Sequence, residues 1–312
     1  MSEEQGQHGE AWPALTEEVP EINAFGVRMR SELGRSLATV TQYKADVTAF
    51  ASFMKSRERI LHAEQADIRN FVVELISKRY SKAVTVRRKL ASLRAFFSFL
   101  ILEKIRTDNP ALGVPPPKAE KRLPKVLNES EIGRVIDAHK AGRHEEFNLR
   151  NYAMLELLYA SGIRRAELVG INVDQVDLDA KMAHVIGKGN KERIVMLNTT
   201  AVKAIRAYLR VRPRSSDPAL FLSQRKTRLG FTQVWTIFSE HLALSGVKKK
   251  ASLHTMRHSF ATHLLENDVD LVSIKEMLGH ESLATTQIYT NVSLKHMRQG
   301  YDRGHPRDRQ AH

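Results

Sequence analysis

Residues 253–290 read LHTMRHSFATHLLENDVDLVSIKEMLGHESLATTQIYT, and four polar side chains in this stretch decide how the chain is interpreted. His254 and Arg257 lie three positions apart, so a helix places them on one face. His280 and Tyr289 lie nine positions apart, which on one straight helix is a rise of about 13.5 Å. That rise is too long for both side chains to reach one atom. The stretch therefore predicts a helical segment that folds back on itself.

The fold-back is expected at Gly279, directly before His280. Ser282 can cap a new short helix that ends near Tyr289. A tyrosine beside basic groups suggests a nucleophile for a phosphate, and the remaining basic groups must then come from elsewhere in the chain.

The composition favours a soluble protein that binds a polyanion. With 312 residues, of which 42% are hydrophobic and 27% charged, the chain is long enough for about two domains with real cores. The net charge of +14 at pH 7 favours nucleic acid as the partner. A membrane surface is the weaker interpretation, because no segment combines a basic face with a bulky apolar one. We expect no membrane partner.

The cysteine count and the N-terminus bear on location. The absence of cysteine excludes disulfides, thiolate metal sites and cysteine nucleophiles, and it fits a reducing compartment. The opening MSEEQGQHGE has neither a basic segment nor an apolar one, so it is not a signal peptide. No apolar run approaches the length of a bilayer span. The expected location is cytoplasmic.

The N-terminal part of the chain is predicted to be helical. Residues 1–20 hold five acidic side chains and no lysine or arginine, which indicates a flexible acidic tail. Residues 21–106 repeat apolar side chains at spacings of three and four, which predicts four helices with room for a short fifth. The last helix carries a basic face, read either as a solvated surface or as a surface for phosphates. Its candidate DNA contacts are Lys82, Arg87, Arg88 and Arg94.

Residues 107–126 form a proline-rich basic linker. Stacked prolines at 115–117 cannot continue a helix and make a stiff, extended spacer. Such a strap can follow a backbone of phosphates between two domains. Its candidate DNA contacts are Lys118, Lys121 and Arg122.

A second domain is predicted at 127–300, followed by a C-terminal tail at 301–312. Asn128 and Glu131 have the spacing of a capping box at the start of its first helix. A strongly apolar helix then ends at Gly162, a residue that commonly stops helices. Residues 183–186 and 193–197 read as two strands of a hairpin, with Lys188 between two glycines in the turn.

The basic groups upstream complete a site for a phosphodiester. Displacement at phosphorus passes through a highly charged intermediate, and cations aimed at its non-bridging oxygens stabilise it. Arg164 and Arg257 suit this role because a guanidinium binds two oxygens at once and stays protonated. Lys188 can donate a proton to the departing 5′ oxygen.

The histidines and the tyrosine complete the proposed chemistry. His254 and His280 can hydrogen-bond the phosphate or accept a proton from Tyr289. A tyrosine has an unperturbed pKa of about 10, so it needs cations or a base nearby to attack at neutral pH. Taken one at a time, each of these residues is more often structural or solvated than catalytic.

A metal site is the competing interpretation. His254, His258 and His263 cluster, and histidines four positions apart can bind zinc. No glutamate follows them as in an HEXXH helix, and the nearby carboxylates are scattered. There is also no glycine-rich loop of Walker type. We expect neither a metal nor another cofactor.

Four segments of the chain resemble the tyrosine recombinases, most closely the bacterial Xer type. They are LLYASGIRRAEL at 157–168, IGKGNKER at 186–193, HTMRHSFATH at 254–263 and LGHESLATTQIY at 278–289. The family's catalytic set is Arg, Lys, His-x-x-Arg, His and Tyr, in this order. All six roles are filled, by Arg164, Lys188, His254, Arg257, His280 and Tyr289.

The match departs from the familiar pattern in three places. Leu253 precedes the first histidine, where many relatives have proline, and Arg165 follows the first catalytic arginine, where a small or apolar residue is common. The acidic N-terminal extension is also longer than usual. None of these changes removes a catalytic group.

The resemblance implies a fold and a reaction. The fold is mainly α with a small β-hairpin or sheet, in a two-domain clamp formed by a helical core-binding domain and a catalytic domain. Tyr289 attacks the scissile phosphate and forms a 3′-phosphotyrosyl bond, which frees a 5′ hydroxyl. A partner strand's 5′ hydroxyl then attacks that bond and reseals the DNA, with no need for metal or nucleotide.

The resemblance also implies partners and a role. Relatives act as tetramers on double-stranded DNA recombination sites, either of one recombinase or of two, and the segment with Met297 and Tyr301 resembles one that docks on a neighbouring subunit. The leading function is Xer-type resolution of chromosome dimers in cell division, with a DNA translocase as a candidate activator. Integration of a phage or mobile element is the alternative. A DNA-binding architectural protein without catalysis is a third hypothesis, which the complete set of six groups disfavours.

Overall fold

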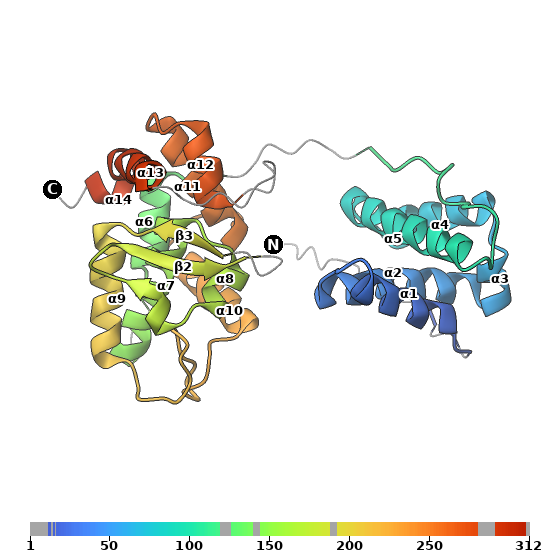
Figure 1. Cartoon of the computed structure of the whole chain (residues 1–312), viewed down its shortest axis with the longest axis horizontal. Coiled ribbons are helices and arrows are strands. Elements are labelled where there is room, and N and C mark those ends of the chain that lie inside the picture. Colours follow the sequence, from blue (N-terminus) through green and yellow to red (C-terminus); the bar gives the residue numbers. More distant parts are fainter. Residues whose placement is uncertain are drawn as a thin grey trace, which may run out of the picture. The chain divides into compact units, whose positions relative to one another are not determined.

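The computed structural model describes residues 12, 13, 15, 17–118, 126–139, 144–187, 192–279 and 291–309 (Figure 1). The chain divides into two compact units, residues 1–122 and 123–312. The predicted fold class, mainly helical with a small sheet in the second unit, is confirmed. The clamp arrangement of the two units stays a prediction. Within the described ranges, no helix is long and apolar enough to cross a membrane.

The described residues of the N-terminal unit form four longer helices and one short one, as the apolar spacing predicts. They are α1 (Pro20–Ser31), α2 (Leu37–Met54), α3 (Arg57–Leu61), α4 (Gln65–Ser77) and α5 (Ala83–Leu102). Ser36 caps α2 by accepting a hydrogen bond from the Thr39 backbone N–H. The core is rich in phenylalanine, and Phe50 contacts Phe71 and Phe97 edge to face.

The C-terminal unit places helices around a three-stranded antiparallel sheet. Its helices are α6 (Glu129–Asp137), α7 (Glu145–Ser161), α8 (Arg165–Gly170), η1 (Val173–Gln175), α9 (Thr199–Val211), α10 (Phe231–Leu244), α11 (Leu253–Glu266), α12 (Leu271–Leu278), α13 (Asn291–Gly304) and α14 (Pro306–Arg309). Its strands are β1 (Val176–Asp177), β2 (Met182–Ile186) and β3 (Glu192–Met196), in the order β1-β2-β3. The predicted hairpin is β2 with β3. β1 is too short to show a period in the sequence.

Helix α7 is the centre of this unit. Most of its residues from Arg150 to Ser161 are buried, and it packs against α6, α9 and α11. Figure 1 shows the sheet lying in front of α7, with α9 along one side. The predicted capping box at the start of α6 is present, since Asn128 and Glu131 exchange backbone and side-chain hydrogen bonds.

The C-terminal residues are packed into their own unit. The Tyr301 hydroxyl donates to the Ala160 carbonyl at 2.8 Å, and Met297 and Tyr301 are both buried. Arg307 lies 2.6 Å from the carboxylate of Glu156, which is buried inside α7. Burial raises the pKa of Glu156 to about 7, and the charge of Arg307 opposes that rise. The tail boundary predicted at residue 300 falls inside α13, so the structured unit continues past it.

Gly162 ends α7 in a left-handed conformation, with φ +57°, and a Cβ there would lie 2.4 Å from a ring carbon of Phe260. We expect Gly162→Ala to lower the stability of this unit by about 2–5 kcal/mol, because left-handed strain and a core clash add. Gly246→Ala is the matched control, since Gly246 has φ +68° and no atom within 4 Å of an added Cβ. It should cost only about 1–2 kcal/mol.

The stability comparison needs a signal from one unit alone. Trp235 lies in α10 of the C-terminal unit, and Trp12 lies in the other unit. Urea unfolding followed by Trp235 fluorescence in a Trp12→Phe background therefore reports on the C-terminal unit. Equal losses for the two glycine substitutions would contradict the clash at Phe260.

Candidate active site

Arg164 stands at the N-terminus of α8 with its side chain 42% exposed. Its backbone N–H donates to Glu167 Oε2 at 2.6 Å, and its Nη1 donates to Glu167 Oε1 at 3.2 Å. Its Nη2 reaches the Gly279 carbonyl at 3.4 Å. The guanidinium is thus held on one side and open to solvent on the other, as a phosphate-binding arginine requires.

Arg257 lies on α11 and is only 7% exposed. Its Nη1 donates to the Gly162 carbonyl, and its Nη2 donates to the Leu278 carbonyl at 2.6 Å. These two carbonyls belong to the ends of α7 and α12, so one side chain joins both ends. Burial, together with the charges of Arg164 and Arg193, lowers the pKa of Arg257 to about 10. It therefore stays protonated at neutral pH.

The two guanidinium groups converge on the same short piece of backbone. Arg257 contacts the carbonyl of Leu278 and Arg164 contacts that of Gly279, the residue directly before His280. Gly279 ends α12 with φ +63°, so the helix stops where the sequence predicts, and the predicted fold-back and the short helix from Ser282 lie outside the described residues. Two convergent cations at this helix end suit a phosphodiester, which gains negative charge as it becomes a phosphorane.

Of the four other predicted catalytic residues, the structure describes only His254. His254 is exposed on α11, one turn before Arg257. Lys188, His280 and Tyr289 lie outside the described residues. The two strands that flank Lys188, β2 and β3, pair as predicted, and their last described pair is Ile186 with Glu192.

Two buried residues at this site were not singled out from the sequence. Glu167 accepts hydrogen bonds from Arg164 and also from Arg193 on β3, whose Nη2 lies 2.8 Å from Glu167 Oε2. Burial raises the pKa of Glu167, but the hydrogen bond and charge of Arg193, with Arg164, outweigh burial and hold the pKa below its usual range. The spacing of Arg164 and Glu167 is that of the glutamate half of a capping box, in which the carboxylate accepts from the N-cap backbone N–H, and that spacing could have identified Glu167.

The candidate DNA contacts of α5 fall into two groups. Lys82 and Arg87 are exposed. Arg88 pairs with the buried carboxylate of Asp46. Arg94 donates from Nε to the Ala111 carbonyl at 3.1 Å and from Nη2 to the Val114 carbonyl at 2.8 Å.

The linker candidates are described only at one position. Lys118 is exposed, whereas Lys121 and Arg122 lie outside the described residues. Contact of any of these lysines and arginines with DNA stays a prediction.

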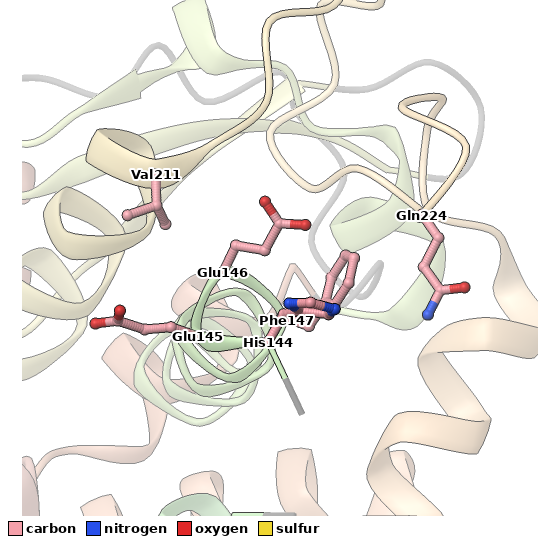
Figure 2. A pocket seen from close by; sticks show the side chains of 6 residues that line it. All are labelled: His144, Glu145, Glu146, Phe147, Val211 and Gln224. Carbon is pink, nitrogen blue, oxygen red and sulfur yellow. The ribbon is translucent and has the colours of Figure 1, made fainter. Parts of the chain in front are cut away.

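An open depression in the C-terminal unit does not coincide with these arginines. It measures about 740 Å³ and is lined by His144, Glu145, Glu146, Phe147, Val211 and Gln224. Figure 2 shows the Glu145 and Glu146 carboxylates extending in different directions from the first turn of α7. Arg164 follows the opposite end of α7, about 25 Å away by helix rise. Two carboxylates disfavour a phosphate here, and in the described part of the chain no group of three acidic, histidine or cysteine side chains is arranged to hold a metal ion.

Comparison with known proteins gives a consistent result over nearly the whole chain. Residues 125–296 match the phage integrase family, and residues 22–104 match the N-terminal SAM-like domain of phage integrases. The tyrosine recombinase XerC of Syntrophus aciditrophicus is 38% identical over 301 residues, covering 90% of this chain and 96% of the relative. The tyrosine recombinase XerD of Oceanobacillus iheyensis is 36% identical over 295 residues, covering 92% of this chain and 98% of the relative.

Solved structures share the fold. The XerH site-specific recombinase bound to its palindromic difH substrate, in a post-cleavage complex, has a TM-score of 0.67 at 19% identity, over 91% of this chain and 84% of that one. A lambda integrase dimer bound to a COC′ core site has a TM-score of 0.68 at 17% identity, over 86% of this chain and 98% of that one.

Proposed function

The chain belongs to the phage integrase family of tyrosine recombinases, and from that premise we propose that its Tyr289 attacks a DNA phosphate held between Arg164 and Arg257. Members of this family cut and rejoin DNA through a phosphotyrosine intermediate, and this chain is a site-specific recombinase of the Xer type. The observation that carries the residue assignment is the convergence of the two guanidinium groups on the backbone directly before His280.

The two arginines have different tasks in this proposal. Arg257 is buried and already holds two carbonyls, so it supplies a fixed positive charge and keeps the turn at residue 279 in place. Arg164 is accessible, and its guanidinium can bind the non-bridging oxygens of a DNA phosphate. Their combined charge stabilises the extra negative charge of the phosphorane as it forms.

The proton and bond changes balance over the other groups. The Tyr289 hydroxyl loses its proton to His254 or His280 and forms a bond to phosphorus, and the bond from phosphorus to the 5′ oxygen breaks. Lys188 donates the proton that the departing 5′ oxygen takes up. The reverse sequence, with a 5′ hydroxyl from a partner strand, reseals the DNA. The bond energy is kept in the phosphotyrosine, so the sequence of steps uses no nucleotide.

A covalent adduct tests the reaction directly. Wild-type protein is incubated with a nicked duplex that carries its binding site, and a protein–DNA species that survives denaturation is sought on a gel. Cleavage close to the nick releases a short fragment that carries the freed 5′ hydroxyl. Once this fragment diffuses away, it cannot reverse the reaction, so the adduct accumulates. Adduct formation should persist with a chelator present. No adduct on a duplex that the protein demonstrably binds would contradict the proposed reaction.

We infer chromosome dimer resolution as the role, carried out in the cytoplasm by a tetramer on two double-stranded DNA sites. The relatives named XerC and XerD support a Xer assignment, and the XerH structure contains a DNA recombination site. A second recombinase and a DNA translocase are the partners proposed with this role. Mapping the bound sequence in the genome separates the two leading roles. A single chromosomal site near the replication terminus supports dimer resolution, and a site at a mobile-element end supports integration.

DNA affinity should fall steeply with salt, because each lysine or arginine that contacts a phosphate releases counterions. We expect Arg87→Ala to weaken binding to all sequences alike and to reduce the magnitude of the salt slope by about 1. Arg30→Ala on α1 is the matched control, because it removes one exposed cation outside the proposed contact set. Its slope should equal that of the wild type. Titrations at four salt concentrations measure both slopes, and equal slopes for the two variants would contradict a contact by Arg87.

A further inference from the structure

Arg193 is a buried arginine on β3 whose guanidinium is fully engaged within the protein. It is 7% exposed. Its Nη2 lies 2.8 Å and its Nε 3.4 Å from the two carboxylate oxygens of Glu167, a bidentate arrangement. Its Nη1 donates to the carbonyl of Met277 near the end of α12. One side chain therefore joins β3, α8 and α12.

The carboxylate that Arg193 holds is the same one that holds Arg164. Glu167 accepts from the Arg164 backbone N–H and from its Nη1. The group of two arginines and one glutamate has a net charge of +1, since 2 − 1 = 1. Without Arg193, Arg164 would be the remaining cationic partner of this carboxylate among the described residues, and the pair would be neutral. Arg193 therefore leaves positive charge on Arg164 for a phosphate.

Gly279, the residue directly before His280, also packs against the Arg193 side chain. A Cβ added to Gly279 would lie 2.8 Å from Arg193 Cδ and 3.0 Å from its Nε, so the backbone packs directly on this side chain. Together with the bond to Met277, this contact fixes where α12 stops and the chain turns. Arg193 also pairs with Val185 in the hairpin, one position before the pair Ile186 and Glu192 that closes on the turn with Lys188.

We propose that Arg193 is a positioning residue for DNA cleavage, which aligns three catalytic segments without touching the DNA. It holds Arg164 through Glu167, fixes the backbone before His280, and ties both to the hairpin that carries Lys188. The proposal rests on the proposed function of this site. Misplacement of reacting groups by about 1 Å can slow a reaction by about 10²-fold, so loss of such an alignment should appear in the rate of cleavage.

The first test uses Arg193→Gln and single-turnover adduct formation on the nicked duplex at saturating DNA. We expect the cleavage rate to fall about 10²-fold while the dissociation constant for DNA changes less than about threefold. Val202→Ala on α9 is the matched control for lost stability, because Val202 is buried away from these contacts. The melting temperatures of Val202→Ala and Arg193→Gln are compared to show that both variants lose stability. The cleavage rate of Val202→Ala should stay within about threefold of the wild type.

The second test asks whether Arg193 also keeps positive charge on Arg164, which a merely structural role would not do. In Arg193→Gln the Glu167 carboxylate keeps Arg164 as its cationic partner among the described residues and neutralises it. Adding Glu167→Gln removes that competing charge, so the double variant should cleave at least about fivefold faster than Arg193→Gln. A structural role predicts that the double variant is no faster than the single one. Arg193→Lys, which keeps the charge but loses the bidentate bond, should fall between wild type and Arg193→Gln.

The outcomes are distinguishable from a failure of the proposed function. Wild-type adduct with an unchanged rate in Arg193→Gln overturns the positioning role and leaves the reaction intact. A rate loss that matches the destabilised Val202→Ala variant, or that is explained by weaker DNA binding, also overturns it. If Arg193→Gln does not fold, Arg193→Lys decides, and a folded Arg193→Lys with the wild-type rate overturns the proposal. Absence of adduct in the wild type contradicts the function itself.

Discussion

Tyr289→Phe is expected to abolish the covalent protein–DNA adduct while DNA binding persists. Phenylalanine keeps the ring but has no oxygen to bond to phosphorus, so no alternative route to the intermediate remains. We expect cleavage to fall by at least about 10⁴-fold, as when a nucleophile is removed from other covalent enzymes. The measurement is adduct yield over hours on the nicked duplex, with binding checked by gel shift.

The other tyrosines of the C-terminal unit are poor substitutes for Tyr289. Burial raises the pKa of Tyr152 to about 12 and also raises the pKa of Tyr159 and Tyr208. The fraction of each residue that is phenolate at neutral pH is therefore smaller than for an ordinary tyrosine. Tyr301 is buried and donates its hydroxyl proton to the Ala160 carbonyl. These environments leave Tyr289 as the expected nucleophile of the C-terminal unit.

Tyr80→Phe is the matched control for this prediction. Tyr80 is exposed in the N-terminal unit, so its hydroxyl can be removed with little effect on the core. The adduct yield should equal that of the wild type. Adduct of normal yield in Tyr289→Phe, or its loss in Tyr80→Phe alone, would show that a different residue is the nucleophile.

Arg257→Ala is expected to lower the cleavage rate by at least about 10²–10³-fold. Removal of one fixed charge that stabilises a transition state typically costs this much. Here the carbonyls of Gly162 and Leu278 also lose their donor, so the turn before His280 loses its support. Arg225→Ala, in an exposed loop, is the matched control for removal of one cation and should retain the wild-type rate.

Arg257→Lys adds a pH dependence whose sign is set by the site. Burial and the charges of Arg164 and Arg193 lower the pKa of Arg257 to about 10. The same environment lowers the pKa of a lysine from a value that starts lower, so a larger share of the lysine is neutral as pH rises. Cleavage by Arg257→Lys should therefore decline more between pH 6 and pH 9 than cleavage by the wild type. A parallel pair of pH profiles would contradict the buried, cation-rich environment.

Local sequence patterns predicted the elements that position the site. The apolar spacing gave the helices of the N-terminal unit, and the glycines around Lys188 gave the hairpin of β2 and β3. The sequence predicts that helices end at Gly162 and Gly279, and both glycines adopt the left-handed conformation that such ends favour. These features depend on interactions within a few residues, which is why they are legible in the sequence.

The sequence did not show which arginines bind other parts of the protein. Arg88 and Arg94 share a basic face with Lys82 and Arg87 in the sequence, but in the structure they hold Asp46 and the carbonyls of Ala111 and Val114. An arginine that binds protein and one that binds phosphate look alike in sequence, because the difference lies in partners far along the chain.

The sequence by itself determined the chemistry, since the identity and order of Arg164, Lys188, His254, Arg257, His280 and Tyr289 indicate the reaction. The tertiary structure decided how two of these groups are held. Glu167 meets Arg193 across 26 positions, and Arg193 meets Met277 across 84. No local pattern specifies contacts of that length, because they form only when packing around α7 brings α8, β3 and α12 together.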